Sequence, residues 1–516
     1  MRYSTLAFLI LATGPFASAS DKPLEIGSRR ELFIDDWLVD RFEGDAKLHM
    51  HKPLGKEVAL KNDKPWEDSS LGYVSVLKDG DLFRMYYRGH HHGSGEDARG
   101  EPMCYAESRD GIRWTKPNLG LFKYQGSTDN NIVLGGDGAK YHPTDKWKGK
   151  LGFETGLGWR GDMVPFIDTR PGVPPDARYK ALVRGARGAH QIPGKHTDYG
   201  MYPFKSPDGI HWTLMSQNPV ITKGRFDSQN LAFWDPVRGR YVAFVRDLLK
   251  RFMRNVHVAV SDDFVNWTEP VPLSYSDKVD RELYTNGILP YERAPHLLLG
   301  FPTEYTDLFA VAQVHPILMT SRDGGHFFKR FREPLISGSA PQERDGNRSN
   351  FMVHGLVRGN QREYFVYATE GYGYEKSDSL PEWRKQSFSP GTRIRRFAFR
   401  VDGFVSVRSG TAGGTIVTKP FVFKGSELQL NYIAWPSRAG RRNSAGEIRV
   451  ELQDANGKPL KGLTLKNCKP LYGDEIDHTV TWQSGVNAAR YAGKPVRLRF
   501  HLRHADLFSF RFVEKP

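Results

Sequence analysis

The sequence predicts an all-β protein in which a five-bladed β-propeller precedes a C-terminal β-sandwich. Three observations support this fold class. A short motif recurs along most of the chain, each copy follows strand-like runs, and the C-terminal residues alternate strictly between apolar and polar side chains. No long stretch shows the apolar period of about 3.6 residues that marks an amphipathic helix, so helix should be scarce.

The recurring motif is a turn signature followed by an aromatic residue. It reads SRDGIRW at 108–114, SPDGIHW at 206–212, SDDFVNW at 261–267 and SRDGGHF at 321–327, and a degraded copy, RVDGFVS, begins at Arg400. Self-similarity with strand patterns inside a unit of about 50 residues is typical of radial repetition. We therefore predict that each unit forms one propeller blade.

The chemistry of this motif suits a tight corner between strands. An aspartate side chain accepts backbone N–H groups two residues on, the glycine supplies a positive φ, and the aromatic residue packs between neighbouring sheets. We therefore interpret four conspicuous acids as structural and exclude them from the catalytic candidates: Asp110, Asp208, Asp263 and Asp323.

The N-terminus has the pattern of a secretion signal. Met1 and Arg2 precede the apolar run 6–16, and Ala17-Ser18-Ala19 resembles a cleavage site. We expect residues 1–19 to be a signal peptide and the protein to be secreted or periplasmic. No later run approaches the roughly 18 consecutive apolar residues of a membrane span.

Residues 20–408 are expected to form the propeller and 409–516 the β-sandwich. A strand from Leu24 is expected to pair with the last blade, because closure removes free sheet edges. The insertion 116–161 is rich in Gly, Asn and Asp, yet it contains several aromatic residues, which favours a packed loop over one face. Val496 to Arg503 shows the two-residue period of a strand with one wet face.

The composition favours an anionic partner outside the cell. The 74 Lys and Arg against 59 Asp and Glu give a formal net charge of +15. The charge is dispersed and no nucleic-acid-binding signature appears, so we do not expect a nucleic acid partner. A sulfated or uronate-bearing polysaccharide suits the charge and the signal peptide. Cys104 and Cys468 fall in different predicted domains and are not expected to form a disulfide.

Carboxylates precede the first strand of four of the five predicted blades. They are Glu67 and Asp68, Asp162, Asp227 and Glu282. The innermost strands of a propeller start at the axis, so these acids should converge at one mouth of the central channel. Several acids around one mouth separate their pKa values, which allows one to donate a proton while another stays ionised.

Together, these corners, the acids ahead of successive blades and the trailing β-sandwich resemble the five-bladed propeller glycosidases, particularly glycoside hydrolase families 32 and 43. The resemblance covers nearly the whole mature chain at the level of architecture. It implies a blade-one Asp as nucleophile or general base, a blade-two Asp that holds the geometry, and a blade-three acid.

Carried onto this sequence, the family 32 pattern W-x-N-D-P-N-G falls on 66–72, with Asp68 as the better match and Glu67 as its rival. The pattern R-D-P falls on 160–162, and the E-C pair falls on Asp227-Ser228. The third site has Asp where those families have Glu, so Glu282 and Glu304 remain alternatives for the acid.

Substrate-binding candidates surround these acids. The aromatic candidates are Trp66, Trp159 and Tyr284, and the polar candidates are Arg160, Asn286, Glu304, Arg344, Arg348 and His354. The run His90–His92 has no Asp or Cys companion at a metal-binding spacing, so we expect an exposed loop and no metal site. No cofactor is expected.

We interpret the sequence as a secreted glycoside hydrolase that cleaves a polysaccharide or its oligosaccharides by paired-carboxylate chemistry. Two alternatives stay open: a carbohydrate-binding propeller without catalysis, and a glycoside phosphorylase that holds phosphate with Arg and His. A shared fold does not fix the function, because one propeller scaffold serves several activities.

Overall fold

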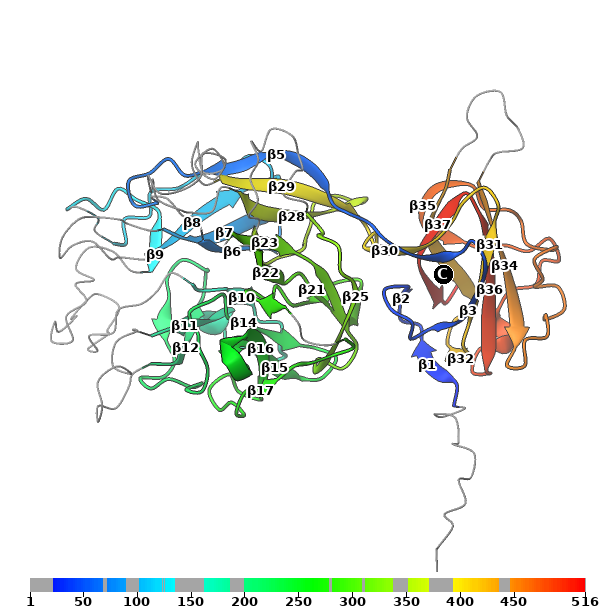
Figure 1. The fold of residues 1–516 in the computed structure, drawn as a ribbon, viewed down its shortest axis with the longest axis horizontal. Coiled ribbons are helices and arrows are strands. Elements are labelled where there is room, and N and C mark those ends of the chain that lie inside the picture. The colour runs from blue at the N-terminus through cyan, green and yellow to red at the C-terminus, as the bar shows by residue number, and fades with distance from the viewer. Residues whose placement is uncertain are drawn as a thin grey trace, which may run out of the picture. The chain divides into compact units, whose positions relative to one another are not determined.

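In the computed structural model the protein is built from β-strands (Figure 1). The structure describes residues 22–67, 72–89, 102–122, 124, 126–134, 162–185, 199–277, 281–308, 311–336, 351–370, 393–435 and 446–515. These residues contain no α-helix, and their helical segments are 3-10 turns: η1 (Pro175–Ala177), η3 (Lys250–Phe252) and η6 (Ala489–Tyr491). The prediction of an all-β protein is confirmed.

Contacts divide the chain into two compact units. Unit 1 combines the N-terminal residues up to Glu31 with Asp36–Lys47 and Val407–Pro516, and unit 2 contains Leu32–Asp35 and Leu48–Ser406. The sequence analysis placed all of 20–408 in one domain, whereas the N-terminal segments of the structure belong to the same unit as the C-terminal residues. Sequence patterns identify strands, but the partner of a strand far along the chain leaves no local signal.

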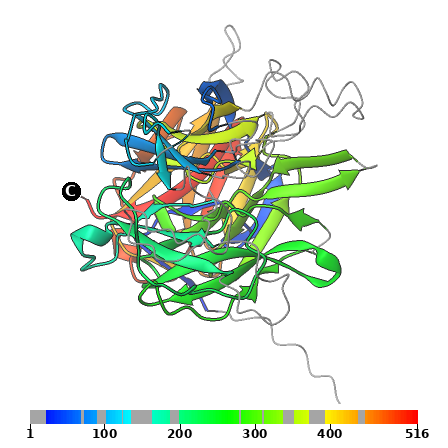
Figure 2. The ribbon, with the colours of Figure 1, turned by 90° about the vertical axis from the view of Figure 1, so that its left-hand side faces the viewer.

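The first three sheets of unit 2 are four-stranded antiparallel meanders in chain order. The strands of the first sheet are β6 (Gly72–Asp79), β7 (Leu82–Arg88), β8 (Met103–Ser108) and β9 (Ile132–Leu134). Those of the second are β10 (Phe166–Ile167), β11 (Tyr179–Arg184), β12 (Met201–Ser206) and β13 (Thr213–Leu214). Those of the third are β14 (Leu231–Asp235), β15 (Arg240–Leu248), β16 (Arg254–Ser261) and β17 (Val271–Pro272). The succession follows the colours from blue to green in Figure 2.

The fourth repeat unit is split between two sheets. One contains β20 (Leu289–Tyr291), β21 (Ala294–Gly300), β24 (Leu318–Ser321) and β25 (His326–Phe331), with β18 (Ser274–Tyr275) parallel to β25. The other contains β19 (Glu282–Leu283), β22 (Thr303–Leu308) and β23 (Val311–Pro316). The long hairpin of β22 and β23 carries its own short partner, so this unit departs from a simple four-stranded meander.

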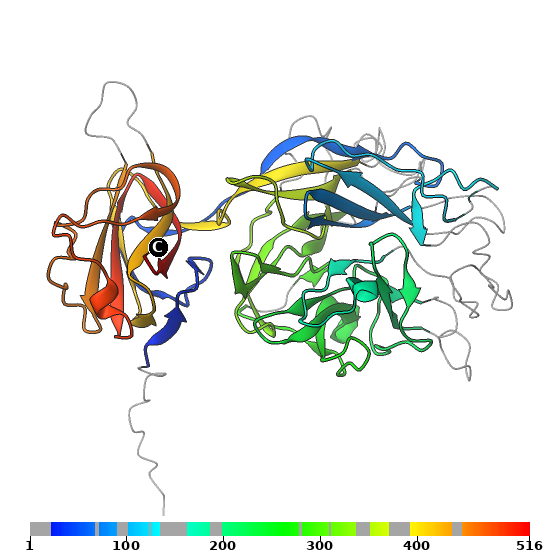
Figure 3. The same ribbon diagram turned by 180° about the vertical axis from the view of Figure 1, so that it is seen from behind.

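The last sheet of unit 2 is completed by a strand from early in the chain. β26 (Phe351–Met352) and β27 (Val357–Arg358) pair with β28 (Glu363–Glu370), which pairs with β29 (Arg393–Arg400), and β5 (Leu54–Lys61) pairs with β29. Figure 3 shows β5 beside β29. The prediction that a strand from Leu24 closes this sheet is wrong, because β1 (Leu24–Gly27) pairs in parallel with β32 (Phe421–Phe423) in unit 1.

The four complete repeat corners have the predicted hydrogen bonds. In the second corner, Ser206 Oγ accepts the Gly209 N–H at 2.9 Å, and Asp208 Oδ1 accepts the N–H groups of Ile210 and His211 at 2.9 and 2.8 Å. Burial alone would raise the pKa of Asp208, but the bonds from His211 and Ile210 lower it to about 2. The same side-chain bonds recur at Asp110, Asp263 and Asp323.

The position after each corner aspartate requires a left-handed backbone. Gly111, Gly209 and Gly324 have φ of 69°, 77° and 84°, and Phe264 takes φ of 72° at the same place in the third corner. A phenylalanine in this conformation is strained by about 1 kcal/mol or more. Phe264 is fully buried in a core cluster, and this packing offsets the strain.

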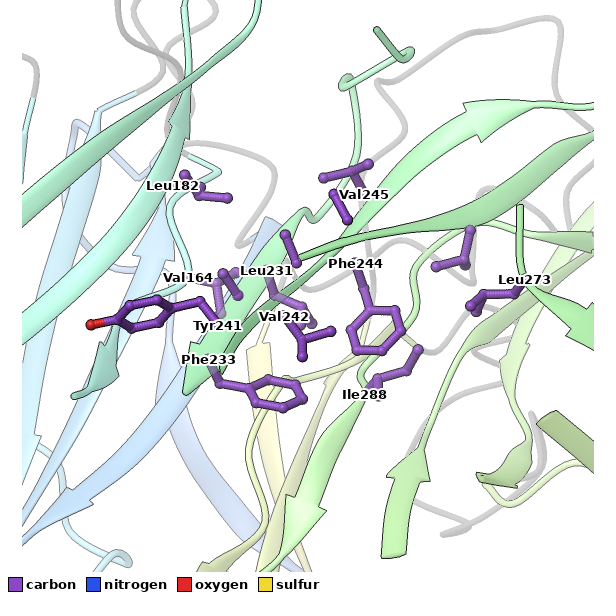
Figure 4. Packing of buried hydrophobic residues seen from close by; sticks show 14 of the residues in the cluster. Val164, Leu182, Leu231, Phe233, Tyr241, Val242, Phe244, Val245, Leu273 and Ile288 are labelled. Atoms are coloured by element: carbon purple, nitrogen blue, oxygen red, sulfur yellow. The ribbon is translucent and has the colours of Figure 1, made fainter. Parts of the chain in front are cut away.

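The motif aromatics join neighbouring sheets as predicted. Trp212 contacts Tyr86 of the first sheet at a centroid distance of 6.4 Å, and Trp114 contacts Tyr367 of the last sheet at 5.8 Å. Figure 4 shows the largest described cluster, where Val164 and Leu182 of the second sheet region meet Leu231 and Phe244 of the third. Burial of apolar surface between adjacent sheets therefore stabilises unit 2.

Unit 1 contains two sheets in which most neighbouring strands are antiparallel. One includes β1, β32, β36 (Val496–Arg503), β31 (Gly414–Thr418), β3 (Val39–Gly44) and β34 (Glu447–Asp454). The other includes β35 (Gly473–Thr479), β33 (Glu427–Ala434) and β37 (Ala505–Val513). β2 (Glu31–Leu32), β4 (Lys47–Met50) and β30 (Val405–Ser409) contain residues at which the chain passes between the units.

Phenylalanine rings fill the space between the two sheets of unit 1. Phe423 of β32 stacks on Phe512 of β37 at 3.7 Å, and Phe500 of β36 lies 6.0 Å from Phe510 of β37. The alternation predicted for 496–503 is confirmed, since every second side chain of β36 is buried. Cys468 of unit 1 and Cys104 of unit 2 are free, buried thiols. None of the helical segments in the described residues has the length and apolarity needed to cross a bilayer.

Asp208→Ala should lower the free energy of unfolding by about 1–3 kcal/mol, because the Ile210 and His211 N–H groups lose their acceptor. Urea denaturation followed by tryptophan fluorescence measures the change. Asp81→Ala is the matched control, since Asp81 lies exposed in another tight turn, and it should change stability by less than about 0.5 kcal/mol. Equal losses in the two variants would contradict the structural role of the corner carboxylate.

Candidate functional site

Several predicted site residues fall outside the described part of the chain. These are Asp68, Trp159, Arg160, Arg344 and Arg348, together with the run His90–His92. The remaining predicted residues are Trp66, Glu67, Asp162, Asp227, Glu282, Tyr284, Asn286, Glu304 and His354. The structure brings some of these together and gives others a local structural role.

Glu67 is fully buried, and both of its carboxylate oxygens accept hydrogen bonds. Tyr87 Oη donates to Oε1 at 2.5 Å, while Lys116 Nζ donates to Oε2 at 2.6 Å. The N–H groups of Asp63 and Lys64 also donate to Oε2, each at 3.1 Å. In this arrangement Glu67 holds the segment from Asp63 to Glu67 in place.

Trp66 is anchored beside this carboxylate. Its Nε1 donates to Asn131 Oδ1 at 2.7 Å, and its ring contacts Tyr124 at a centroid distance of 5.6 Å. Asn131 also donates to Tyr87 Oη at 2.7 Å. Trp66 and the neighbouring Glu67 are therefore fixed by a buried hydrogen-bond network.

Asp162 forms a buried ion pair ahead of the second sheet. Its Oδ2 lies 2.8 Å from Arg184 Nε, and the two side chains are 0% and 4% exposed. Arg184 is the last residue of β11. Removal of either partner of a buried ion pair would leave an uncompensated charge, so this pair stabilises the protein only while both side chains are present.

Asp227 occupies the equivalent place ahead of the third sheet, but it is partly open to solvent. Its carboxylate pairs with the guanidinium of Arg246, and the Asp227 side chain is 34% exposed while that of Arg246 is 8% exposed. Burial lowers the pKa of Arg246, and the nearby charge of Arg254 lowers it further. Tyr73 Oη donates to the backbone carbonyl of Asp227 at 3.2 Å.

Glu282 provides a second partly exposed carboxylate. Arg254 Nη1 donates to Glu282 Oε2 at 2.6 Å, and the side chain of Glu282 is 27% exposed. The same guanidinium lies 5.3 Å from the centre of the Tyr284 ring and 5.0 Å from that of Tyr305. Tyr284 meets Phe351 of β26 edge to face at 5.4 Å.

We group these residues as the polar cluster, because Ser228, which follows Asp227, donates from Oγ to the Tyr284 carbonyl and so brings the two ion pairs into one region. It consists of Tyr73, Asp227, Arg246, Arg254, Glu282 and Tyr284. Its members come from the first, third and fourth repeat units, so residues far apart in sequence meet in one place. Two carboxylates, two guanidinium groups and two phenol rings can together bind a polar ligand that also presents apolar faces.

The backbone of Tyr73 is strained at this point. Its φ is 47°, and the register of β6 against β7 shifts between Gly72 and Ser75. The guanidinium of Arg88 lies over the Tyr73 ring at 4.5 Å from its centre. A non-glycine residue held at positive φ costs about 1–3 kcal/mol, and such strain gathers at functional sites.

Asn286 supports the polar cluster through hydrogen bonds to the backbone. It is buried, and its Nδ2 donates to the backbone carbonyls of Gln229 and Phe244, each at 3.3 Å. Gln229 Nε2 donates in turn to the carbonyl of Val74 at 2.9 Å. These bonds tie the first, third and fourth repeat units together, so Asn286 positions the site and does not line it.

Glu304 lies in the short sheet of β19, β22 and β23, where it is paired with Leu283, the neighbour of Glu282. It is buried, Arg281 Nη1 donates to it at 2.6 Å, and His315 Nε2 lies 3.4 Å away. Burial alone would raise its pKa, but the bonds from His315 and Arg281 lower it overall. A carboxyl with a lowered pKa is a poor proton donor near neutral pH.

His354 connects the last sheet to the first. Its N–H donates to the Val74 carbonyl at 3.0 Å, and its carbonyl accepts the Val76 N–H at 2.8 Å. Burial lowers the pKa of His354 to about 4. Within the described residues, His354 Nδ1 and Ser75 Oγ are buried and have no hydrogen-bond partner. Buried polar atoms of this kind are satisfied by a water or a ligand.

The sequence analysis did not anticipate the arginines at the ends of the second strands. Arg88, Arg184 and Arg246 occupy equivalent places in three consecutive sheets, and all three are buried. The signal was present as YYRG, LVRG and FVRD in the sequence. Asp162 and Asp227, the carboxylate partners of Arg184 and Arg246, each precede the first strand of the same sheet and are distant from the arginine in sequence. The described residues contain no group of three side chains that could hold a metal ion.

A scan against models of protein families finds no match, and neither does a search of curated proteins. Among solved structures, a protein described as a glycoside hydrolase is 14% identical, with a TM-score of 0.44 over 68% of this chain and 92% of its own. An N-acetylgalactosamine deacetylase from F. plautii, solved with blood group B trisaccharide, is 12% identical, with a TM-score of 0.43 over 69% and 96%. A family 117 glycoside hydrolase of Zobellia galactanivorans is 11% identical, with a TM-score of 0.37 over 68% and 90%. Similarity of this degree assigns no reaction to the chain.

The burial of His354 should make the protein less stable in mild acid. Its pKa is about 4 when folded and about 6.5 when unfolded, so between these values only the unfolded chain is protonated. Stability therefore falls as the pH drops from about 6.5 to about 4, and this contribution is constant below that range. His354→Asn should show a smaller loss over the same range, measured as the free energy of unfolding in urea.

His478→Asn is the control for this comparison, because His478 is an exposed histidine of unit 1. It should retain the full loss of stability in acid. If His354→Asn and the wild type lose the same free energy of unfolding between the two pH values, the claim that folded His354 stays neutral in this range is wrong.

Proposed function

We propose that this protein is a glycoside hydrolase whose reaction takes place at the polar cluster. The observation that carries the proposal is the pair of partly exposed carboxylates, Asp227 and Glu282, beside the rings of Tyr73 and Tyr284. Cleavage of a glycosidic bond uses two carboxyl groups around one sugar. Tyrosine rings supply the apolar faces on which sugar rings stack.

We also propose a five-bladed β-propeller for unit 2 and a β-sandwich for unit 1. The antiparallel sheets that follow one another in chain order, and the hydrogen bonds between their first segments, support the propeller. The phenylalanine contacts between the sheets of unit 1 support the sandwich. In a propeller, segments ahead of the first strands converge at one end of the axis, which accounts for the hydrogen bond between Tyr73 of the first sheet and Asp227 ahead of the third.

The contacts of each acid indicate which role we propose for it in the reaction. Asp227 and Glu282 each pair with a guanidinium group, and we propose them for the group that attacks the anomeric carbon or activates water. The proton donor must then be another carboxyl, and we propose Asp68 for this role. Glu67 and Asp162 are proposed to position the site, because their carboxylates are buried and bonded within the protein.

An anionic polysaccharide is the proposed substrate class. The net charge of +15 and the arginines of the polar cluster favour sulfate or uronate groups on the sugar. Secretion or a periplasmic location is proposed from the signal peptide pattern at 1–19, where such a polymer would be met.

Asp227→Asn should abolish the release of reducing ends from sulfated or uronate polysaccharides, with a loss of about 10³-fold or more. Glu282→Gln should do the same if it shares the ionised role. Asp68→Asn should lose activity on polysaccharides but retain it on aryl glycosides with a good leaving group, which depart without protonation. Reducing-end assays and chromophore release measure the two activities.

Glu269→Gln is the matched control for Glu282→Gln, since Glu269 is an exposed glutamate paired with Lys223 and neither residue belongs to the polar cluster. Its activity should equal that of the wild type. Circular dichroism checks that the variants fold. Full turnover by folded Asp227→Asn and Glu282→Gln would contradict the proposed site.

The two arginines of the polar cluster favour glycoside phosphorolysis as a second candidate function. Arg246 and Arg254 lie close enough that the charge of Arg254 lowers the pKa of Arg246, and such a pair suits a phosphate dianion. Turnover that requires inorganic phosphate and yields a sugar phosphate would select this reaction. Binding of polysaccharide without turnover of any substrate would select a carbohydrate-binding protein.

A further inference from the structure

Unit 1 contains a cavity that the proposed reaction does not use. It has a volume of about 420 Å³ and is lined by Asp45, Lys47, Arg408, Trp435 and His504. All of these residues belong to unit 1. Cavities of roughly 300–1,000 Å³ are typical of sites for small ligands.

An exposed aromatic side chain lies at this cavity. Trp435 is 40% exposed, which is unusual for an indole at the end of a core strand, β33. Its backbone is fixed, because its N–H donates to the His504 carbonyl at 3.1 Å and its carbonyl accepts the Gly446 N–H at 2.8 Å. Only glycine fits at 446, where an added Cβ would lie 2.2 Å from the His504 carbonyl oxygen. A rigid, exposed indole is a ready surface for the apolar face of a pyranose ring.

His504 also lines the cavity, beside this indole, and its backbone is strained. Its φ is 46°, a conformation that turns normally assign to glycine or asparagine. Its N–H donates to the Gly410 carbonyl at 2.7 Å, and its ring lies 6.4 Å from that of Trp435. Among the described residues Nδ1 of His504 is buried without a hydrogen-bond partner. Strain of this kind points to a requirement for the side chain itself.

Two of the three charged side chains at the cavity, Arg408 and Asp45, are already bonded within the protein. Arg408 pairs with Asp506 through two bonds of 2.7 and 3.0 Å, and Asp45 accepts bonds from Ser409 Oγ and the Gly410 N–H. In the described part of the chain, Lys47 forms no ion pair. Its exposed ammonium group therefore remains available to a negatively charged ligand.

We propose that this cavity is a carbohydrate-binding site for oligosaccharides that carry a carboxylate or sulfate group. A sugar ring stacks on Trp435 beside His504, and Lys47 pairs with the anionic substituent. The site binds without catalysis, because its carboxylates are engaged by protein donors. It lets the protein hold a polymer chain independently of the polar cluster.

The test is affinity gel electrophoresis of the full chain against three probes: polygalacturonate, carrageenan and neutral xylan. The wild type should be retarded more by the two anionic polymers, whose comparison distinguishes carboxylate from sulfate. Trp435→Ala should weaken binding about tenfold or more, while Trp435→Phe should retain most of it. Lys47→Met should reduce the preference for anionic over neutral polymer.

Tyr472→Ala is the matched control, because Tyr472 is an aromatic residue of unit 1 that is 54% exposed and does not line the cavity. It should bind as the wild type does. Equal affinity of the folded Trp435→Ala and Tyr472→Ala variants, or no binding of the wild type to any probe, would overturn the proposal. Because the assay measures retention without turnover, its failure is distinguishable from a failure of the proposed hydrolysis.

Discussion

The hydrogen bonds of the repeat corner are the constraint on which unit 2 depends. Each corner aspartate accepts two backbone N–H groups, and each corner serine accepts another, so the chain reverses without leaving buried donors unpaired. The corner then delivers an aromatic side chain to the neighbouring sheet, as Trp212 does against Tyr86. Local hydrogen bonding and packing between sheets are thus coupled in one short motif.

The second organising feature is the set of arginine–carboxylate pairs ahead of successive sheets. Asp162 with Arg184 and Asp227 with Arg246 repeat the same pairing, but the first is buried and the second is partly open. A buried pair that loses one partner is strongly destabilised, whereas a partly exposed pair can exchange protein contacts for a ligand. Of these two equivalent ion pairs, we therefore interpret the buried one as structural and the partly exposed one as part of the candidate site.

The parts of the structure that follow from local chemistry were predictable from the sequence. The corner aspartates, the alternation of 496–503 and the all-β class depend on neighbours in the chain. The pairing of β5 with β29, and of β1 with β32, depends on distant partners and was not predicted correctly. The sequence offered Asp227 and Glu282 as candidates, but it gave no sign of the arginines that pair with them, because those ion pairs join separate strands and loops.

The central claim is that water attacks a glycosidic bond at the polar cluster. Mass spectrometry of products formed from anionic polysaccharides in ¹⁸O-labelled water tests it most directly. The account predicts oligosaccharides with one ¹⁸O atom at the new reducing end from the wild type, and none from Asp227→Asn. Products that lack ¹⁸O and carry phosphate, or labelled products formed equally by Asp227→Asn, would contradict it.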